Sequence, residues 1–255
     1  MSSVSSLVER LRAGPVYSAW CGLPDPSVAG LLAREGFDAV TLDMQHGAID
    51  LSEVTAAILL VAAAGKPAIA RLPVGAFPTA SRLLDAGAAA IIAPMVNTVE
   101  DAKLFAGLTK YPPMGERSWG PHGAIALTGL GFPEYFKAAN GFSLALAMIE
   151  TREALGLIDD ILAVDGLDGV FLGPSDLSIA LSNGTSLDPN GAEVDRALDH
   201  ALARAKAAGK FAGAYAATGE RAGALAKRGF QLLTIGSDSG MLRAGAQAAL
   251  AAARG

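Results

Sequence analysis

The sequence predicts an α/β protein that forms one domain over residues 1–255, a (β/α)8 barrel. Short apolar runs alternate with segments of helical period along the whole chain, and a length near 250 residues is typical of such barrels. Each run has the length and character of a strand that is buried on both faces. The eight runs cover residues 16–21, 38–43, 68–72, 89–94, 143–149, 169–173, 211–215 and 232–236.

The segments between these runs carry helix-start signals, namely a capping residue followed by first-turn acids. These signals are Asp50 with Glu53, Thr98 with Asp101, and Thr218 before Glu220. Strand and helix repeated eight times predicts parallel pairing through right-handed crossovers, which closes naturally into a barrel. An open doubly wound sheet is the competing architecture.

The segment from about residue 110 to 141, after the fourth strand, interrupts this alternation. It is rich in Gly, Pro and aromatic residues. A connection of this length in a compact domain is usually a lid or an oligomer contact, so we predict a long loop insertion there.

Composition excludes several classes of function. The 51% hydrophobic content supports a large core, and 20 basic against 25 acidic residues leave a net charge of −5. A surface of this sign offers no field for nucleic acid. Cys21 is the single cysteine, so no internal disulfide forms. The N-terminal residues lack an apolar stretch that would serve as a secretory signal or a membrane anchor. We therefore expect a cytoplasmic protein with neither a nucleic-acid nor a membrane partner.

Chemically capable side chains gather at the predicted strand ends, where the active sites of such barrels lie. Asp43 ends the second strand with His46 just beyond it, and Arg71 ends the third. Glu150 follows the fifth strand and Asp176 follows the sixth. We expect these five side chains to meet at one rim.

Glu150 and Asp176 are candidate ligands of a divalent cation. They follow adjacent strands, and two carboxylates beside an arginine suit a hard, oxygen-preferring ion such as Mg²⁺ or Mn²⁺. The alternative is that each carboxylate caps the helix that follows it, since the next residues of both look like helix starts.

Arg71 and His46 each have two interpretations. The guanidinium of Arg71 can clamp a carboxylate or keto oxygen, or it can form an ion pair with Asp43 or Glu150. His46 can be a base or a structural hydrogen-bonding residue. Trp20, from the first strand, is a candidate for substrate binding. No lysine ends a predicted strand, which disfavours an imine mechanism, and no GxGxxG pattern follows the first strand.

Several motifs, in this order, resemble the HpcH/HpaI aldolase family, the metal-dependent class II pyruvate aldolases. They are WCGLPDP, GFDAVTLDMQHG, ARLP, LLDAGAAAIIAPMV, PPMGERSWGP, AMIETREAL and DGVFLGPSDLS. The resemblance implies a (β/α)8 barrel that cleaves hydroxy-keto acids, with Mg²⁺ or Mn²⁺ as cofactor and Co²⁺ as a further candidate. It also implies a homo-oligomer, a hexamer, with sites near subunit interfaces.

Carried over position by position, the resemblance gives each candidate a role. Glu150 and Asp176 ligate the metal, and Arg71 contacts the donor's keto oxygen. His46, supported by Asp85 and near Asp43, takes part in proton transfer. The donor's carboxylate is received by backbone groups of Gly173, Pro174, Ser175 and Asp176.

The sequence departs from the family's common residues at Gln45, Met148 and Gly123. Many members have Glu, Gln and Arg there, so the acceptor preference of any one member does not transfer. Gly123 in particular is expected to open the acceptor pocket or to remove an acid-binding group.

The predicted function is reversible cleavage of a 4-hydroxy-2-keto acid into pyruvate or hydroxypyruvate and an aldehyde. A lyase acting on CoA thioesters is one alternative, for which Arg117 and Arg152 near the rim would have to hold phosphates. A barrel that binds a keto acid without catalysis is the other.

Overall fold

The computed structural model describes residues 2–255 and confirms the predicted barrel. Eight parallel strands pair in sequence order, and β8 pairs with β1, which closes the sheet and excludes the open alternative. The strands are β1 (Val16–Cys21), β2 (Ala39–Asp43), β3 (Ala68–Arg71), β4 (Ala90–Ala93), β5 (Leu144–Ile149), β6 (Gly169–Leu172), β7 (Phe211–Ala216) and β8 (Leu232–Ile235).

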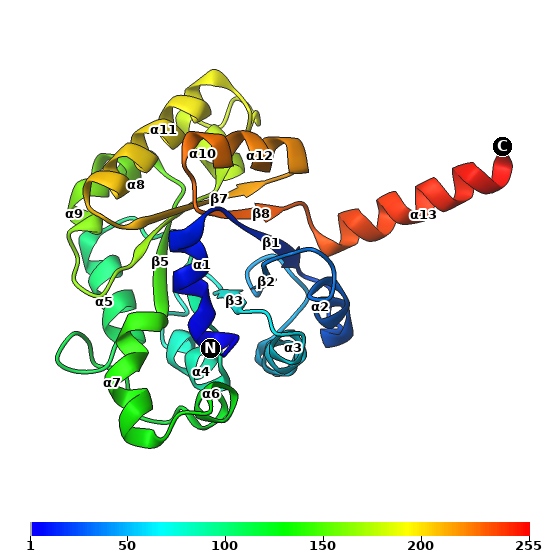
Figure 1. Cartoon of the computed structure of the whole chain (residues 1–255). Coiled ribbons are helices and arrows are strands. Elements are labelled where there is room, and N and C mark those ends of the chain that lie inside the picture. The colour runs from blue at the N-terminus through cyan, green and yellow to red at the C-terminus, as the bar shows by residue number, and fades with distance from the viewer. Residues whose placement is uncertain (1) are drawn as a thin grey trace.

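Helices surround the sheet (Figure 1). They are the 3-10 helix η1 (Val4–Ser6) and α1 (Leu7–Ala13), α2 (Pro26–Leu32), α3 (Leu51–Ala63), α4 (Thr79–Ala86), α5 (Val99–Thr109), α6 (His122–Thr128), α7 (Phe132–Phe142), α8 (Arg152–Gly156), α9 (Ile158–Leu162), α10 (Pro174–Leu181), α11 (Ala192–Ala207), α12 (Gly219–Arg228) and α13 (Asp238–Arg254). No helix within residues 2–255 combines the length and the apolar character that crossing a bilayer requires.

The predicted helix starts are present as hydrogen-bonded caps. The Asp50 side chain accepts a hydrogen bond from the Ser52 N–H, and the Glu53 side chain accepts one from the Asp50 N–H, which completes a capping box. Thr98 and Thr218 cap α5 and α12 in the same manner, each through its side-chain oxygen. These caps satisfy N–H groups that a helix cannot pair internally.

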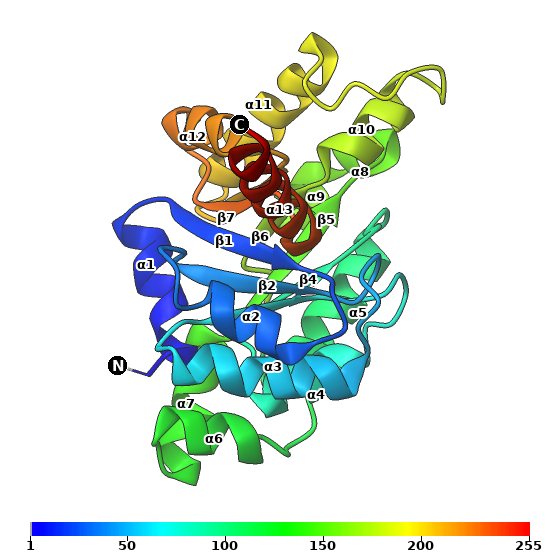
Figure 2. The same cartoon turned by 90° about the vertical axis from the view of Figure 1, so that its right-hand side faces the viewer.

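The segment between residues 110 and 141 is not a continuous loop. It contains α6 and α7, which lie beside each other and near α4 at one end of the molecule (Figure 1, Figure 2). Its helical period was hidden by the Gly and Pro residues, which in the structure stand at helix ends: Gly129 follows α6 with a φ of 70°, and Pro133 occupies the first turn of α7. A left-handed glycine after a helix and a proline in its first turn are both compatible with helix formation.

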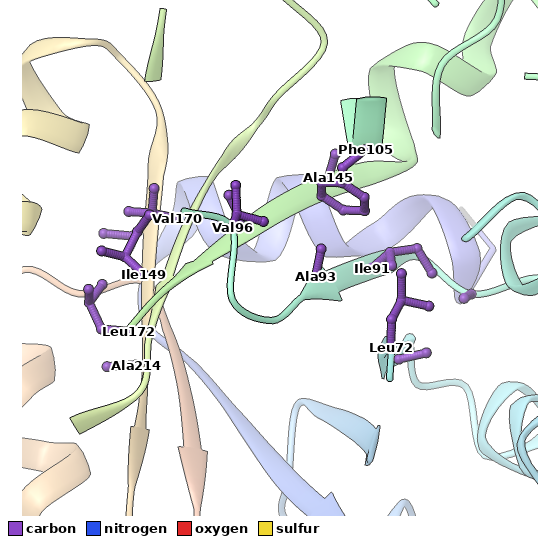
Figure 3. Packing of buried hydrophobic residues seen from close by; sticks show 14 of the residues in the cluster. Leu72, Ile91, Ala93, Val96, Phe105, Ala145, Ile149, Val170, Leu172 and Ala214 are labelled. Carbon is purple, nitrogen blue, oxygen red and sulfur yellow. The ribbon is translucent and has the colours of Figure 1, made fainter. Parts of the chain in front are cut away.

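Strand side chains alternate between the barrel interior and an outer layer beneath the helices. On β5, Leu146 and Met148 belong to the inner cluster, whereas Ala145 and Ile149 belong to the outer one. Figure 3 shows part of the outer layer, where Ala145 and Ile149 pack among side chains from neighbouring elements. The inner cluster includes Leu7 and other residues of η1 and α1, so the N-terminal end of the barrel is filled with apolar side chains.

A buried ion pair ties the starts of β5 and β6 together at this closed end. The Lys110 ammonium lies 2.7 Å from the Asp168 carboxylate and donates to the carbonyl oxygens of Asn140 and Ser143. Asp168 also accepts a hydrogen bond from the Ala145 N–H. The most buried lysine is therefore a structural cross-link at the end opposite Glu150.

The last helix departs from the usual barrel. α13 projects away from the sheet instead of covering β8 and β1, and its residues from 242 to 255 are exposed (Figure 1). Leu242 and Leu250 are 67% and 53% exposed, so the apolar side of α13 has no cover within the described chain.

Replacing Lys110 with Met should destabilise the fold by about 3 kcal/mol, because the substitution removes the cation paired with Asp168 and the donor to two carbonyl oxygens. Urea unfolding measures this change. The matched control is Arg204→Met, which removes an exposed ion pair with Asp159 and should cost no more than about 1 kcal/mol. Equal effects of the two substitutions would contradict the structural role of Lys110.

Candidate active site

Strand alternation delivers the polar side chains to the open, C-terminal end of the barrel interior. On β5 the inward-facing series 144, 146 and 148 reaches Glu150 directly after the strand. Asp43 and Arg71 end β2 and β3 and are direct neighbours in the sheet register. Trp20 lies on β1 with its ring in the inner cluster. Each side chain is thus positioned by the same period of two that builds the core.

Glu150 is a buried carboxylate with one unpaired oxygen. Its side chain accepts a hydrogen bond of 3.0 Å from the Met95 N–H through Oε2. Oε1 is buried and has no hydrogen-bond partner among residues 2–255. Because an unpaired buried carboxylate oxygen is costly, this atom calls for a cation or a donor that the chain itself does not supply.

Two backbone features hold Glu150 in this position. Met95 has a φ of +54°, a left-handed conformation that is uncommon for a residue other than glycine and that accompanies its hydrogen bond to Glu150. Gly173 lies so close that an added Cβ would stand 2.6 Å from Glu150 Oε1 and 2.9 Å from the Met148 methyl carbon. A larger residue at position 173 would therefore displace the Glu150 carboxylate or the Met148 side chain from its present position.

Neither Glu150 nor Asp176 caps the helix that follows it. Thr151 caps α8 by accepting from the Ala154 N–H. Asp176 lies in the first turn of α10, whose N-cap is Gly173, and no side chain caps that helix. The capping alternative is therefore wrong for both carboxylates, which leaves them available to a ligand.

The electrostatic environment of Glu150 is that of an acid without its counter-ion. Burial raises the pKa of Glu150 to about 7, and the negative charge of Asp176 adds to the rise, while the Met95 hydrogen bond and the charge of Arg71 oppose it. A buried carboxylate whose charge is opposed by a second oxygen-donor carboxylate fits a hard divalent cation. No group of three His, Cys, Asp or Glu side chains suited to a metal occurs within the described residues, so the remaining ligands would be substrate or water.

Arg71 is held by Asp43 through two hydrogen bonds. Nε lies 2.8 Å from Oδ1 and Nη2 lies 2.6 Å from Oδ2, and the indole N–H of Trp20 donates to the same carboxylate at 3.0 Å. Burial would raise the pKa of Asp43, but hydrogen bonding to Arg71 and its positive charge outweigh this and hold the pKa below its usual value. The ion-pair interpretation of Arg71 is thus correct as far as Asp43 is concerned.

The same pairing leaves one edge of the guanidinium for a ligand. Nη1 faces the Met148 sulfur at 3.9 Å, a weak acceptor, and the guanidinium lies over the Trp20 ring at 4.7 Å. Arg71 is therefore fixed in orientation and still has an N–H group to offer an oxygen in the cavity.

A cavity of about 680 Å³ lies at the C-terminal end of the barrel. Glu150 is not among the residues that line it, but Gly173, which lies against the Glu150 carboxylate, is. Among the predicted site residues, those that line it are Trp20, Asp43, His46, Arg71, Gly173, Pro174, Ser175 and Asp176. No lysine is among the described residues that line it.

Two lining residues with polar side chains, Tyr215 and Asp238, were missed by the sequence reasoning. Tyr215 follows the inward series of β7, and its ring meets Trp20 edge-on at 5.4 Å, so strand alternation could have identified it. Asp238 accepts hydrogen bonds from the N–H groups of Gly22 and Leu23, which ties the loop after β1 to α13. Its partners lie more than 200 residues away, and no local pattern reveals such a contact.

Most of the chain is similar to proteins of one family. Residues 17–244 match the family described as HpcH/HpaI aldolase/citrate lyase. The hydroxypyruvate/pyruvate aldolase of Rhizorhabdus wittichii is 42% identical over 240 residues, which is 94% of each chain. The 4-hydroxy-2-oxo-heptane-1,7-dioate aldolase of Klebsiella pneumoniae is 35% identical over 94% of this chain and 90% of its own.

The fold comparison gives the same result. A crystal structure of an HpcH/HpaI aldolase/citrate lyase family protein from Burkholderia cenocepacia superposes with a TM-score of 0.87 and 30% identity, over 98% of this chain and all of the other. The chain belongs to the HpcH/HpaI aldolase/citrate lyase family. It is an enzyme of the aldolase and lyase class.

Asp85, expected beside His46, lies elsewhere in this member of the family. It belongs to α4, and its carboxylate is 2.6 Å from the Arg117 guanidinium, outside the residues that line the cavity. The structure therefore brings His46 close to Asp43, whose Oδ1 accepts from the His46 backbone N–H, and does not join His46 to Asp85 within one chain.

The two arginines needed by a CoA thioester lyase are also engaged elsewhere. Arg117 is buried against Asp85 and the Tyr111 ring, and Arg152 donates to the carbonyl oxygen of Ala180 near the end of α10. Neither lines the cavity, so the expectation that they stand at its rim was wrong.

Three positions depart from the residues that are common in the family. Two of them lie at or next to the site, and the third does not. Gln45 adjoins His46, and its Oε1 is buried without a partner among the described residues, while Met148 lies against Arg71. Gly123 is on α6, where an added Cβ would meet the carbonyl oxygens of Ala86 and Asp85 at 3.0 Å. It therefore packs α6 onto α4 and does not open the cavity in this chain.

Glu150→Gln should stabilise the metal-free protein at high pH. A carboxyl whose pKa is raised by folding from 4.5 to about 7 contributes stability that is lost as pH rises through this range, at most about 3 kcal/mol. The glutamine of the variant does not titrate, so the stability of the variant does not fall for this reason as pH rises. In chelator it should therefore unfold at higher urea than the wild type at pH 8 and at a similar concentration at pH 4.5, whereas a less stable variant at pH 8 would contradict the assigned environment.

Proposed function

We propose that this protein is a divalent-metal-dependent aldolase that reversibly cleaves 4-hydroxy-2-keto acids to pyruvate or hydroxypyruvate and an aldehyde. The observation that carries the proposal is the unpaired Oε1 of Glu150 at the end of β5, next to a second carboxylate and an oriented arginine. The names of the aldolase relatives, which specify hydroxypyruvate, pyruvate and 4-hydroxy-2-oxo acids, support the substrate class.

Glu150 and Asp176 would hold the cation. Carboxylate oxygens suit Mg²⁺ or Mn²⁺, with Co²⁺ as a further candidate. When bound, such an ion polarises a keto oxygen as a Lewis acid and lowers the pKa of a bound water.

The chain's own groups orient the donor. Arg71, locked by Asp43, offers its Nη1 N–H where negative charge develops on the keto oxygen of the enolate. The N–H groups of Ser175 and Asp176, in the uncapped first turn of α10, can receive the donor's carboxylate. Trp20 and Met148 flank the guanidinium and keep water from it.

His46 is the proposed proton carrier. His46 lines the cavity and is exposed, and its backbone N–H donates to Asp43. In the cleavage direction one ring nitrogen, directly or through a water, accepts the proton of the 4-hydroxyl group as the carbon–carbon bond breaks and the aldehyde forms. In synthesis it returns that proton to the new alkoxide oxygen.

Pyruvate release from 4-hydroxy-2-oxo acids tests the proposal. Chelator should abolish release and Mn²⁺ or Mg²⁺ should restore it. Glu150→Gln should be inactive, and Arg71→Lys should lower kcat by about 10²- to 10³-fold because the bidentate fork is lost. Arg34→Lys, an exposed change, is the control. Activity that survives metal removal, or that depends on Lys66 and not on Glu150, would overturn the mechanism.

We also propose that the chain is a homo-oligomer, with the hexamer as the expected state. The exposed Leu242 and Leu250 on the projecting α13 support self-association, because a barrel normally covers β8 and β1 with its last helix. Exposed aromatic side chains of the 110–141 segment, Trp119, Phe132 and Phe136, offer a second apolar surface. In such an assembly, His46 of one subunit could contact only the Asp85 of another subunit, because the two residues are apart within one chain.

Light scattering after size exclusion tests self-association. The wild type should elute as an oligomer, and the double variant Leu242→Lys, Leu250→Lys should have a smaller mass, because it places charges on the buried side of the contact. A monomeric wild type would contradict the proposal, as would a double variant of unchanged mass.

A further inference from the structure

Large apolar side chains stand at the mouth of the cavity, beside polar ones such as Ser175 and Ser239. Leu23, Ala48, Ile179 and Leu187 line the same cavity as Asp43, Asp176 and Arg71. Ile179 is 43% exposed and Leu187 is 67% exposed, which places both large apolar side chains at the border between the cavity and solvent. A ligand that extends outward from the floor would cover them.

These side chains stand on two sides of the opening. Leu23 and Ala48 follow β1 and β2, whereas Ile179 and Leu187 follow β6, which is four strands from β2 in the closed barrel. Ile179 lies three residues after Asp176 on α10, so the two share one face of the helix. A molecule held near Asp176 therefore passes Ile179 on its way out.

The charges of the cavity do not favour a second anion. Among the described residues that line it, the only Lys or Arg is Arg71, and Asp43 already occupies two of its nitrogen atoms. The other charged lining groups are acidic, namely Asp176 and Asp238. A carboxylate at the far end of an acceptor would find no second Lys or Arg among these residues.

We propose that the acceptor side of this site takes neutral, apolar aldehydes, with Ile179 and Leu187 as specificity-determining residues. This inference rests on the proposed aldolase function. In synthesis the carbon beside the donor's ketone loses a proton and forms a bond to the aldehyde carbonyl carbon, whose oxygen takes up a proton. The remaining carbon chain of the aldehyde then extends between the two apolar walls.

The test compares butanal with 4-oxobutanoate as acceptors of pyruvate, because both have four carbons and only the second ends in a carboxylate. The wild type should favour butanal in kcat/KM by about tenfold or more. From ethanal to butanal, kcat/KM should rise about fourfold for each methylene group that becomes buried.

Lysine variants separate recognition from the intrinsic reactivity of the two aldehydes. Ile179→Lys and Leu187→Lys should each shift the preference toward 4-oxobutanoate by about tenfold, since either supplies the missing cation. Leu104→Lys, an equally exposed change on α5 outside the cavity, should leave the preference unchanged. A wild type that prefers 4-oxobutanoate, or lysine variants without effect on the ratio, would overturn the inference.

A measurement without any aldehyde distinguishes a failure of the acceptor inference from a failure of the proposed aldolase function. Metal-dependent deuterium exchange at the methyl group of pyruvate, followed by NMR, reports only the donor half of the reaction. Exchange with the predicted acceptor preference supports both proposals. Exchange with the opposite preference overturns the acceptor inference alone, and a lack of exchange and of turnover overturns both.

Discussion

Glu150 is the residue around which the rest of the site is arranged. It ends an inward-facing series of apolar side chains on β5, where the interior offers little to a charge, and one of its oxygens has no partner among residues 2–255. Met95 adopts a left-handed backbone conformation beside it, and Gly173 lacks the Cβ that would collide with it. The unpaired oxygen and the left-handed Met95 backbone both destabilise the fold. We infer that they are retained because Glu150 binds a ligand.

The second constraint is the pairing of Arg71 with Asp43. Because the two residues are direct neighbours in the β2–β3 register, the guanidinium cannot rotate freely, and Trp20 restricts it further. The positive charge is thus fixed before any substrate arrives, and Nη1, which faces only the weakly accepting Met148 sulfur, keeps its capacity to donate to a ligand. Fixed charge of this kind needs no reorganisation during a reaction, which is why it is effective in stabilising an enolate.

The strand runs and their alternation were sufficient to predict the barrel and the rim at which Asp43, Arg71, Glu150 and Asp176 meet, because both follow from a period of two. Contacts between distant segments were not predictable in this way. The helical nature of α6 and α7 was hidden by Gly and Pro residues that stand at helix ends. The partner of Asp85 is Arg117, 32 residues further along the chain, and no spacing rule connects them.

The central claim is that Glu150 and Asp176 together bind one divalent cation. Calorimetric titration of Mn²⁺ into the chelator-treated protein at neutral pH measures this directly, and Asp176→Asn and Ser175→Ala form a matched pair on the same turn of α10. The account predicts one ion per chain, an affinity that falls by about 100-fold or more in Asp176→Asn, and a near-normal affinity in Ser175→Ala. Equal Mn²⁺ affinities for the wild type and Asp176→Asn would contradict it.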